Sequence, residues 1–150
     1  MSGSKKRKQE KNIDSVKRTH QSVNPDSYYT KYPNWRFKRV FLNHRWAIDL
    51  DNGNRFIKSI LPKLISYETQ TWQEIVGTPK GRGDGSKSHS VSIVNLCQEA
   101  QKLLQDNNIY IDDLFSLRLT GKERVWGILE NGVLDIIWYD SDHEICPVNK

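Results

Sequence analysis

The clearest hydrophobic pattern lies in the C-terminal third of the chain. Three apolar runs rich in β-branched and aromatic residues cover residues 115–119, 124–129 and 133–139. A polar turn at residues 120–122 separates the first two, and Asn131-Gly132, a dipeptide typical of tight β-hairpins, separates the last two. The pattern predicts an antiparallel meander of three strands.

The meander is expected to gather cations on one face. Because side chains alternate between the faces of a strand, Ser116 and Arg118 should share a face, which Arg124 joins if the register permits. His143 follows the third strand. Arginine binds phosphate oxygens bidentately and histidine carries protons near neutral pH, so the three would suit a phosphodiester. Arginines on a solvated sheet face and a histidine in a turn are also ordinary surface residues.

Two more strands are expected nearer the N-terminus. Residues 35–42 alternate bulky and basic side chains, which predicts a strand with Arg36 and Lys38 on its wetter side. Residues 46–50 are expected to return as a second strand before a polar turn.

Helical spacing of apolar residues appears in three segments. The first segment covers residues 55–67, where Pro62 implies a kink or a break into two short helices. A second helix is expected over residues 71–76, with Thr69 or Thr71 as its cap and Gly77 as its end. A third is expected over residues 93–105.

The order of these elements predicts an α+β domain. It consists of a small antiparallel sheet, made of the C-terminal meander and an N-terminal strand, with two to three helices packed on one face. Trp72, Leu96, Leu104 and Trp138 should be buried between helices and sheet.

Residues 78–90 form a glycine-rich basic segment without large apolar side chains. It contains Arg82, Lys87 and His89, and its glycines match neither a Walker motif nor a dinucleotide-binding motif. Such a loop can close over a polyanion, because the backbone approaches phosphate closely and donates amides. A mobile surface connection is the alternative.

The net charge of +5 is concentrated in the first residues of the chain. Residues 1–20 hold seven basic and two acidic side chains, which leaves sixteen of each in residues 21–150. Residues 1–27 therefore predict a disordered basic tail, and residues 28–150 a single domain. The tail could attract nucleic acid or an acidic partner, or serve only as a solubilising terminus.

The cysteines and the hydropathy indicate a cytoplasmic protein without a membrane partner. Cys97 and Cys146 show no metal-binding spacing and are expected to be reduced thiols, and no run approaches the roughly 20 apolar residues that span a bilayer. No cofactor or metal is expected. Binding of a divalent cation is a minor alternative, with candidate ligands at Asp140, Asp142, His143 and Glu144.

The segment RLTGKERVWGILENGVLDIIWYDSDHEI resembles the C-terminal half of the RelE/ParE-like toxins of toxin-antitoxin systems. That family has early helices followed by a β-meander with the pattern R-x-x-G-x-x-R-hydrophobic, which Arg118, Gly121 and Arg124 match. The glycine-rich segment is long for the family, and acidic residues surround His143. The resemblance extends loosely over about two-thirds of the chain.

The resemblance implies a metal-independent endoribonuclease that cleaves mRNA by attack of the 2′-hydroxyl on the adjacent phosphate. It assigns the scissile phosphate to Arg118 and Arg124, and the acid/base role to His143 or Tyr139, with His89 as a rival. Further RNA contacts are expected from Lys122, Lys87, Arg82, Lys38 and Arg36. The partners implied are mRNA, on or off the ribosome, and a cognate antitoxin.

Two alternatives remain open at this point. One is a catalytically inactive module of the same fold that binds RNA or a protein. The other is a regulatory protein that acts through its basic tail.

Overall fold

The computed structural model describes residues 28–48, 53–77 and 88–147. The predicted disordered tail and most of the glycine-rich segment, including Arg82 and Lys87, lie outside these ranges. The strands are β1 (Asn34–Arg36), β2 (His89–Ser92), β3 (Asp113–Arg118), β4 (Arg124–Glu130) and β5 (Val133–Asp140). The helical segments are α2 (Gly53–Arg55), η1 (Phe56–Ile60), α3 (Leu61–Tyr67), α4 (Trp72–Val76), η2 (Ile93–Asn95) and α5 (Gln98–Asp106).

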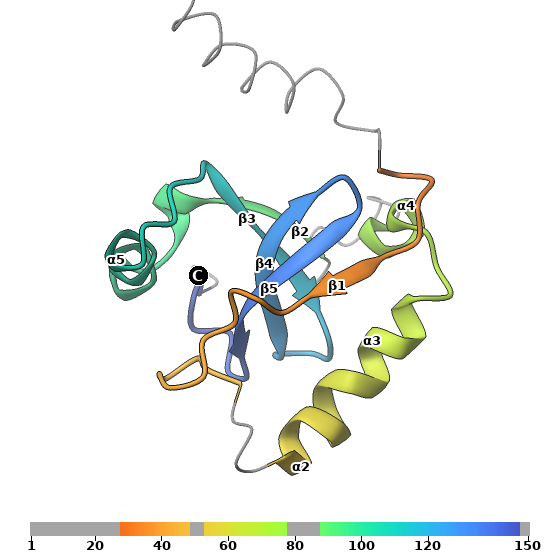
Figure 1. Cartoon of the computed structure of the whole chain (residues 1–150), viewed down its shortest axis with the longest axis horizontal. Coiled ribbons are helices and arrows are strands. Elements are labelled where there is room, and N and C mark those ends of the chain that lie inside the picture. The colour runs from red at the N-terminus through yellow and green to blue at the C-terminus, as the bar shows by residue number, and fades with distance from the viewer. Residues whose placement is uncertain (1–27, 49–52, 78–87, 148–150) are drawn as a thin grey trace, which may run out of the picture.

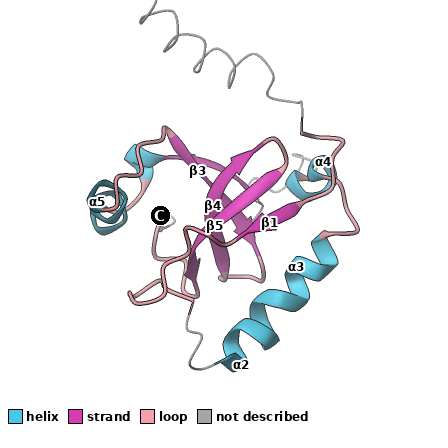
Figure 2. Cartoon of the chain, viewed as in Figure 1, coloured by secondary structure: helices cyan, strands magenta, loops and turns pink. Residues whose placement is uncertain are grey.

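The five strands form one mixed sheet in the order β1-β5-β4-β3-β2. Figure 2 shows the strands between α5 and α3. The predicted meander is confirmed, because β3, β4 and β5 pair antiparallel in sequence. Its second turn places Asn131 and Gly132 at φ 54° and 85°, the left-handed values that an Asn-Gly hairpin favours. The sheet is larger than predicted, since β2 adds an antiparallel edge, and β1 pairs parallel to β5.

A β-bulge interrupts the pairing of β4 with β5. Trp126 lies opposite Trp138 while the next residue, Gly127, lies opposite Ile136, so one residue of β5 has no partner in β4. A Cβ atom at Gly127 would come within 2.4 Å of the Asp135 carbonyl oxygen. Glycine is therefore required for the backbones to approach this closely.

The α+β class is confirmed, but the helices are divided between the two faces of the sheet rather than packed on one (Figure 1). On one face, α3 and α4 cover a core that contains Trp72 and Leu117. On the other, α5 covers a core that contains Leu104 and Trp138. The strands carry apolar side chains on both faces, so both faces must be covered. Trp72, Leu96, Leu104 and Trp138 are all buried, as predicted.

The N-terminal strand is shorter than predicted. It ends at Arg36, because the chain turns there and the amide of Val40 bonds to the carbonyl of Phe37 at 3.1 Å. Residues 46–48 are not a strand, although the carbonyl of Trp46 accepts a hydrogen bond from the Tyr139 amide of β5 at 2.8 Å. Residues 49–50 lie outside the described part of the chain.

The first two predicted helices are present with modified ends. The first begins at Gly53 and passes through the π-helical segment η1, and Pro62 stands in the first turn of α3, where a missing amide proton is tolerated. Thr71 caps α4 through a capping box with Glu74, and Gly77 ends it at φ 75°.

The third predicted helix is divided. Its first residues form η2, and the α-helix proper begins at Gln98. Within the described ranges, no helix combines the length and apolar character needed to cross a membrane.

Candidate functional site

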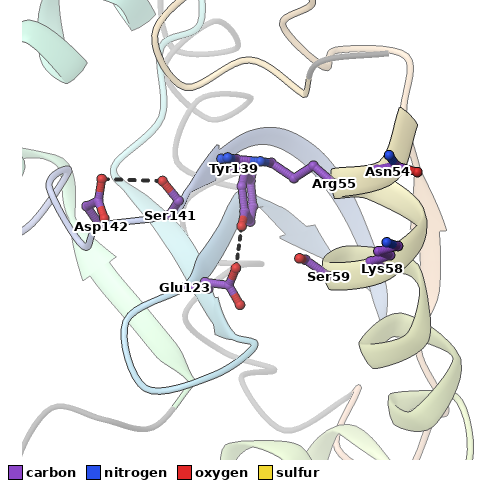
Figure 3. Close-up of a pocket in the computed structure, with 8 residues that line it drawn as sticks. All are labelled: Asn54, Arg55, Lys58, Ser59, Glu123, Tyr139, Ser141 and Asp142. Atoms are coloured by element: carbon purple, nitrogen blue, oxygen red, sulfur yellow. Dashed lines mark hydrogen bonds between the residues drawn. The ribbon is translucent and has the colours of Figure 1, made fainter. Parts of the chain in front are cut away.

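A polar pocket lies at the end of the sheet where β5 terminates. It has a volume of about 540 Å³ and is bounded by the start of the α2–η1 helix, the β3–β4 turn and the end of β5 (Figure 3). Its lining residues are Asn54, Arg55, Lys58, Ser59, Glu123, Tyr139, Ser141 and Asp142.

A carboxylate is held in a fixed position in this pocket. The Tyr139 hydroxyl donates to Glu123 Oε2 at 2.5 Å, and the Thr120 hydroxyl donates to Oε1 at 2.9 Å. Burial raises the pKa of Tyr139 well above the ordinary value of a tyrosine, and the hydrogen bond to Glu123 and the negative charge of Glu123 raise it further. Tyr139 therefore keeps its proton and acts as a hydrogen-bond donor to Glu123.

Two cations from one helix line the same pocket. The Arg55 guanidinium lies 5.7 Å from the centre of the Tyr139 ring, and Lys58 and Ser59 come from the π-helical segment η1. Residues 53–67 contain three basic side chains and no acidic one. A π-helical segment inside a longer helix is frequent at functional sites, because it changes the direction of the side chains it carries.

Arg118 and Arg124 lie directly opposite each other across β3 and β4, as the alternation predicted. Arg118 is exposed, whereas Arg124 is only 2% exposed. Burial, and then the charge of Arg118, lowers the pKa of Arg124.

The Arg124 guanidinium closes the β3–β4 turn. Its Nη1 donates to the carbonyl oxygens of Thr120, Gly121 and Glu123 at 2.9, 3.2 and 3.0 Å. Arg124 thus stabilises the turn that contains Glu123.

The acidic side chains at the end of β5 and just after it make structural contacts. Asp140 is fully buried, and its carboxylate accepts the amides of Glu144 and Ile145 at 2.8 and 2.9 Å. Asp142 lies 3.6 Å from Lys122 in an exposed ion pair. His143 is partly exposed in the turn at φ 60°. Among the described residues, no group of three or more potential ligands could hold a metal ion.

The remaining predicted site residues are spread over the sheet. His89 lies on the edge strand β2 opposite Ser116, on the face shared by Arg118 and Arg124. Arg36 and Lys38 lie at the opposite edge, at the end of β1 and in the turn that follows. Arg82 and Lys87 lie outside the described residues.

Six of the eight lining residues were not identified from the sequence: Asn54, Arg55, Lys58, Ser59, Glu123 and Ser141. Glu123 lies inside the R-x-x-G-x-x-R pattern, but a charged residue in a turn is expected to be solvated. The uniformly basic charge of residues 53–67 was a usable signal for Arg55 and Lys58.

Comparison with protein-family models, curated proteins and solved structures finds no match for this chain. The resemblance of the meander to RelE/ParE-like toxins stays a prediction.

Proposed function

We propose that the protein is a cytoplasmic, metal-independent endoribonuclease whose reaction takes place in the pocket at the end of β5. One observation carries the proposal: a fixed carboxylate, Glu123, shares a pocket with the cations Arg55 and Lys58. A base and two positive charges are what cleavage of RNA through its own 2′-hydroxyl requires.

In the proposed reaction, Glu123 takes the proton of the 2′-hydroxyl as the 2′-oxygen bonds to the adjacent phosphorus. Arg55 and Lys58 stabilise the negative charge that builds up on the phosphate oxygens. The bond from phosphorus to the 5′-oxygen then breaks, and that oxygen takes a proton from Lys58. The products are a 2′,3′-cyclic phosphate and a 5′-hydroxyl.

The meander residues take supporting roles in this proposal. Tyr139 positions Glu123 and keeps its own proton, and Arg124 fixes the turn that carries Glu123. Arg118 is exposed beside that turn but does not line the pocket, because its side chain lies on the opposite face of the sheet from Tyr139. An antitoxin that neutralises the protein would have to cover this end of the sheet.

A binding module without catalysis is the second candidate. Glu123 already accepts hydrogen bonds from Tyr139 and Thr120, so both of its carboxylate oxygens are engaged within the protein and its role would be structural. In that case the same cations would hold RNA without cleaving it.

Both candidates share a prediction for RNA affinity. Arg55→Gln and Lys58→Gln should each weaken binding and reduce the slope of log affinity against log salt by about 1, because each removes one phosphate contact. Fluorescence anisotropy with a 2′-O-methyl RNA, which cannot be cleaved, measures both quantities on the full chain.

Lys102→Gln is the matched control, since this exposed lysine of α5 pairs with Asp106 on the other face of the sheet. The basic tail is present in every variant, so its contribution cancels. The Arg55 and Lys58 variants could instead show the same slope of log affinity against log salt as Lys102→Gln. That result would place RNA binding outside the pocket and favour the basic tail as the RNA-binding segment.

A further inference from the structure

The two cysteines, 49 positions apart in the sequence, stand side by side where α5 begins. The amide of Cys97 donates to the carbonyl of Ile145 at 2.8 Å, and that carbonyl belongs to the peptide group that joins Ile145 to Cys146. The backbones of the two cysteines are therefore in direct contact. Disulfides form between residues whose Cα atoms lie roughly 4.4–6.8 Å apart, so close approach of the two backbones is the first requirement for a bridge.

The two sulfur atoms share one partly buried environment. Both thiols are free and half-buried, and both pack against the core beneath α5. The Cys146 thiol donates to the carbonyl of Asn95, two residues before Cys97, at 3.5 Å. Burial raises the pKa of Cys146, and interaction with the Cys97 thiol and with Asp140 raises it further.

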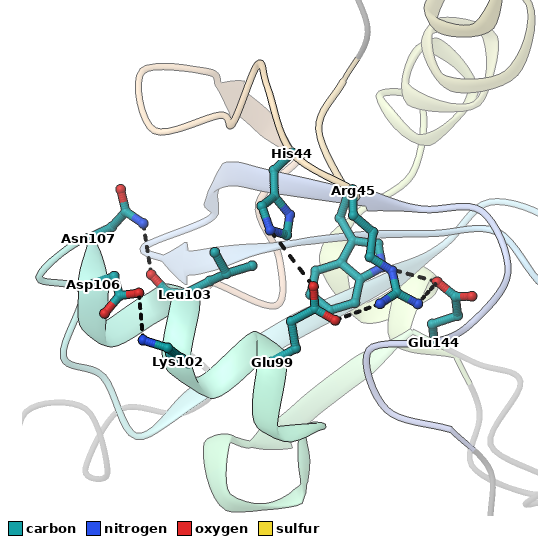
Figure 4. Close-up of polar contacts among 9 residues, drawn as sticks. His44, Arg45, Glu99, Lys102, Leu103, Asp106, Asn107 and Glu144 are labelled. Carbon is teal, nitrogen blue, oxygen red and sulfur yellow. Dashed lines mark hydrogen bonds and ion pairs between the residues drawn. The ribbon is translucent and has the colours of Figure 1, made fainter.

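An ion-pair network holds the two segments together beside the cysteines. The Arg45 guanidinium bonds to Glu99 of α5 at 2.6 Å and to Glu144 at 2.9 Å (Figure 4). Glu99 lies two residues after Cys97, and Glu144 two residues before Cys146. The two segments thus stay adjacent without a covalent link.

We propose that Cys97 and Cys146 are a redox modification site that closes to an intramolecular disulfide in the presence of a small-molecule disulfide such as glutathione disulfide. One cysteine thiolate attacks the oxidant, forms a mixed disulfide and releases one glutathione thiolate. The second cysteine thiolate attacks the protein sulfur of the mixed disulfide and releases the second glutathione. The protein loses two protons and two electrons, and the oxidant is reduced to two thiols.

The disulfide would attach α5 to the segment that follows β5. It would enclose the whole meander in a covalent loop of about 50 residues and so restrict the unfolded chain. The site lies on the face of α5, away from the proposed nuclease pocket, and is independent of that proposal.

The test is oxidation of the full-length protein with glutathione disulfide at equal ionic strength across a pH series. Intact mass should fall by two hydrogen atoms, and a protease digest should contain one linked pair of peptides with Cys97 and Cys146. The midpoint of thermal unfolding should rise by about 5 °C or more, and dithiothreitol should reverse the change. Because each sulfur acts once as a thiolate, the raised pKa of Cys146 predicts that the rate keeps increasing above pH 9.

Cys97→Ser and Cys146→Ser are matched controls that retain the fold through a similar polar side chain. Each should stop at a stable glutathione adduct, with no rise in thermal stability. A wild-type protein that also accumulates stable glutathione adducts, or that forms only disulfide-linked dimers, would overturn the proposal.

Discussion

Gly127→Ala is expected to lower the free energy of unfolding by about 3 kcal/mol or more, because the added Cβ meets backbone and not a movable side chain. It would come within 2.4 Å of the Asp135 carbonyl oxygen, 2.9 Å of the carbonyl carbon and 3.0 Å of Ile136 Cα. The strands β4 and β5 would have to separate at the bulge. Urea unfolding followed by tryptophan fluorescence measures the change.

Gly121→Ala provides the control for this prediction. A Cβ atom at Gly121 meets nothing within 4 Å, and this glycine has no left-handed backbone angle. Its unfolding free energy should stay within about 0.5 kcal/mol of the wild type. Equal stability of the two alanine variants would show that β4 and β5 do not approach each other as closely as the structure places them.

Glu123→Gln should reduce RNA cleavage by about 10²- to 10⁴-fold, the usual contribution of a general base. The amide retains the shape of the side chain and a hydrogen bond with Tyr139, so the fold and the pocket should persist. RNA affinity should be unchanged or slightly stronger, because a negative charge near the phosphate is removed. Initial cleavage rates and anisotropy on the same preparation separate the two effects.

Glu130→Gln is the control for the change of charge, since Glu130 is exposed at the far end of β4. It should cleave at the wild-type rate. If Glu123→Gln cleaves as fast as Glu130→Gln, the base is another residue, and His143 and His89 become the next variants to measure.

The meander could be predicted because its determinants are local. Alternating apolar residues and an Asn-Gly turn specify pairing between strands that follow one another directly, and the predicted facing of Arg118 and Arg124 is confirmed. The strand β2 could not be predicted in this way. Its sequence, His-Ser-Val-Ser, is short and polar, and it becomes a strand because the exposed edge of β3 supplies hydrogen bonds.

The position of α5 depends on the sheet and not on its own sequence. An amphipathic pattern shows that one side of a helix is buried, but not which face of a sheet buries it. The two-sided apolar character of β3 and β5, with Leu114 beside Phe115 and Ile136 beside Ile137, is the signal that both faces need cover. That signal was present in the sequence.

The pocket illustrates what spacing along the chain does not reveal. Arg55 and Glu123 are far apart in sequence and line one pocket because the α2–η1 helix lies beside the end of β5. The role of Arg124 also depends on the folded turn, because three backbone carbonyls converge on its guanidinium. A sequence pattern locates such an arginine at the correct end of the sheet but not the partner it binds.

The chemistry of the cut RNA ends tests the proposed endoribonuclease mechanism directly. A defined RNA, free and on translating ribosomes, is incubated with the full-length protein in excess EDTA, and the ends of the products are analysed. The proposed mechanism predicts 2′,3′-cyclic phosphate and 5′-hydroxyl ends, no cut where the nucleotide before the scissile phosphate is 2′-deoxy, and almost none with Glu123→Gln. RNA that stays intact with the wild-type protein in both forms, or that is cut equally well at a 2′-deoxy nucleotide, would contradict it.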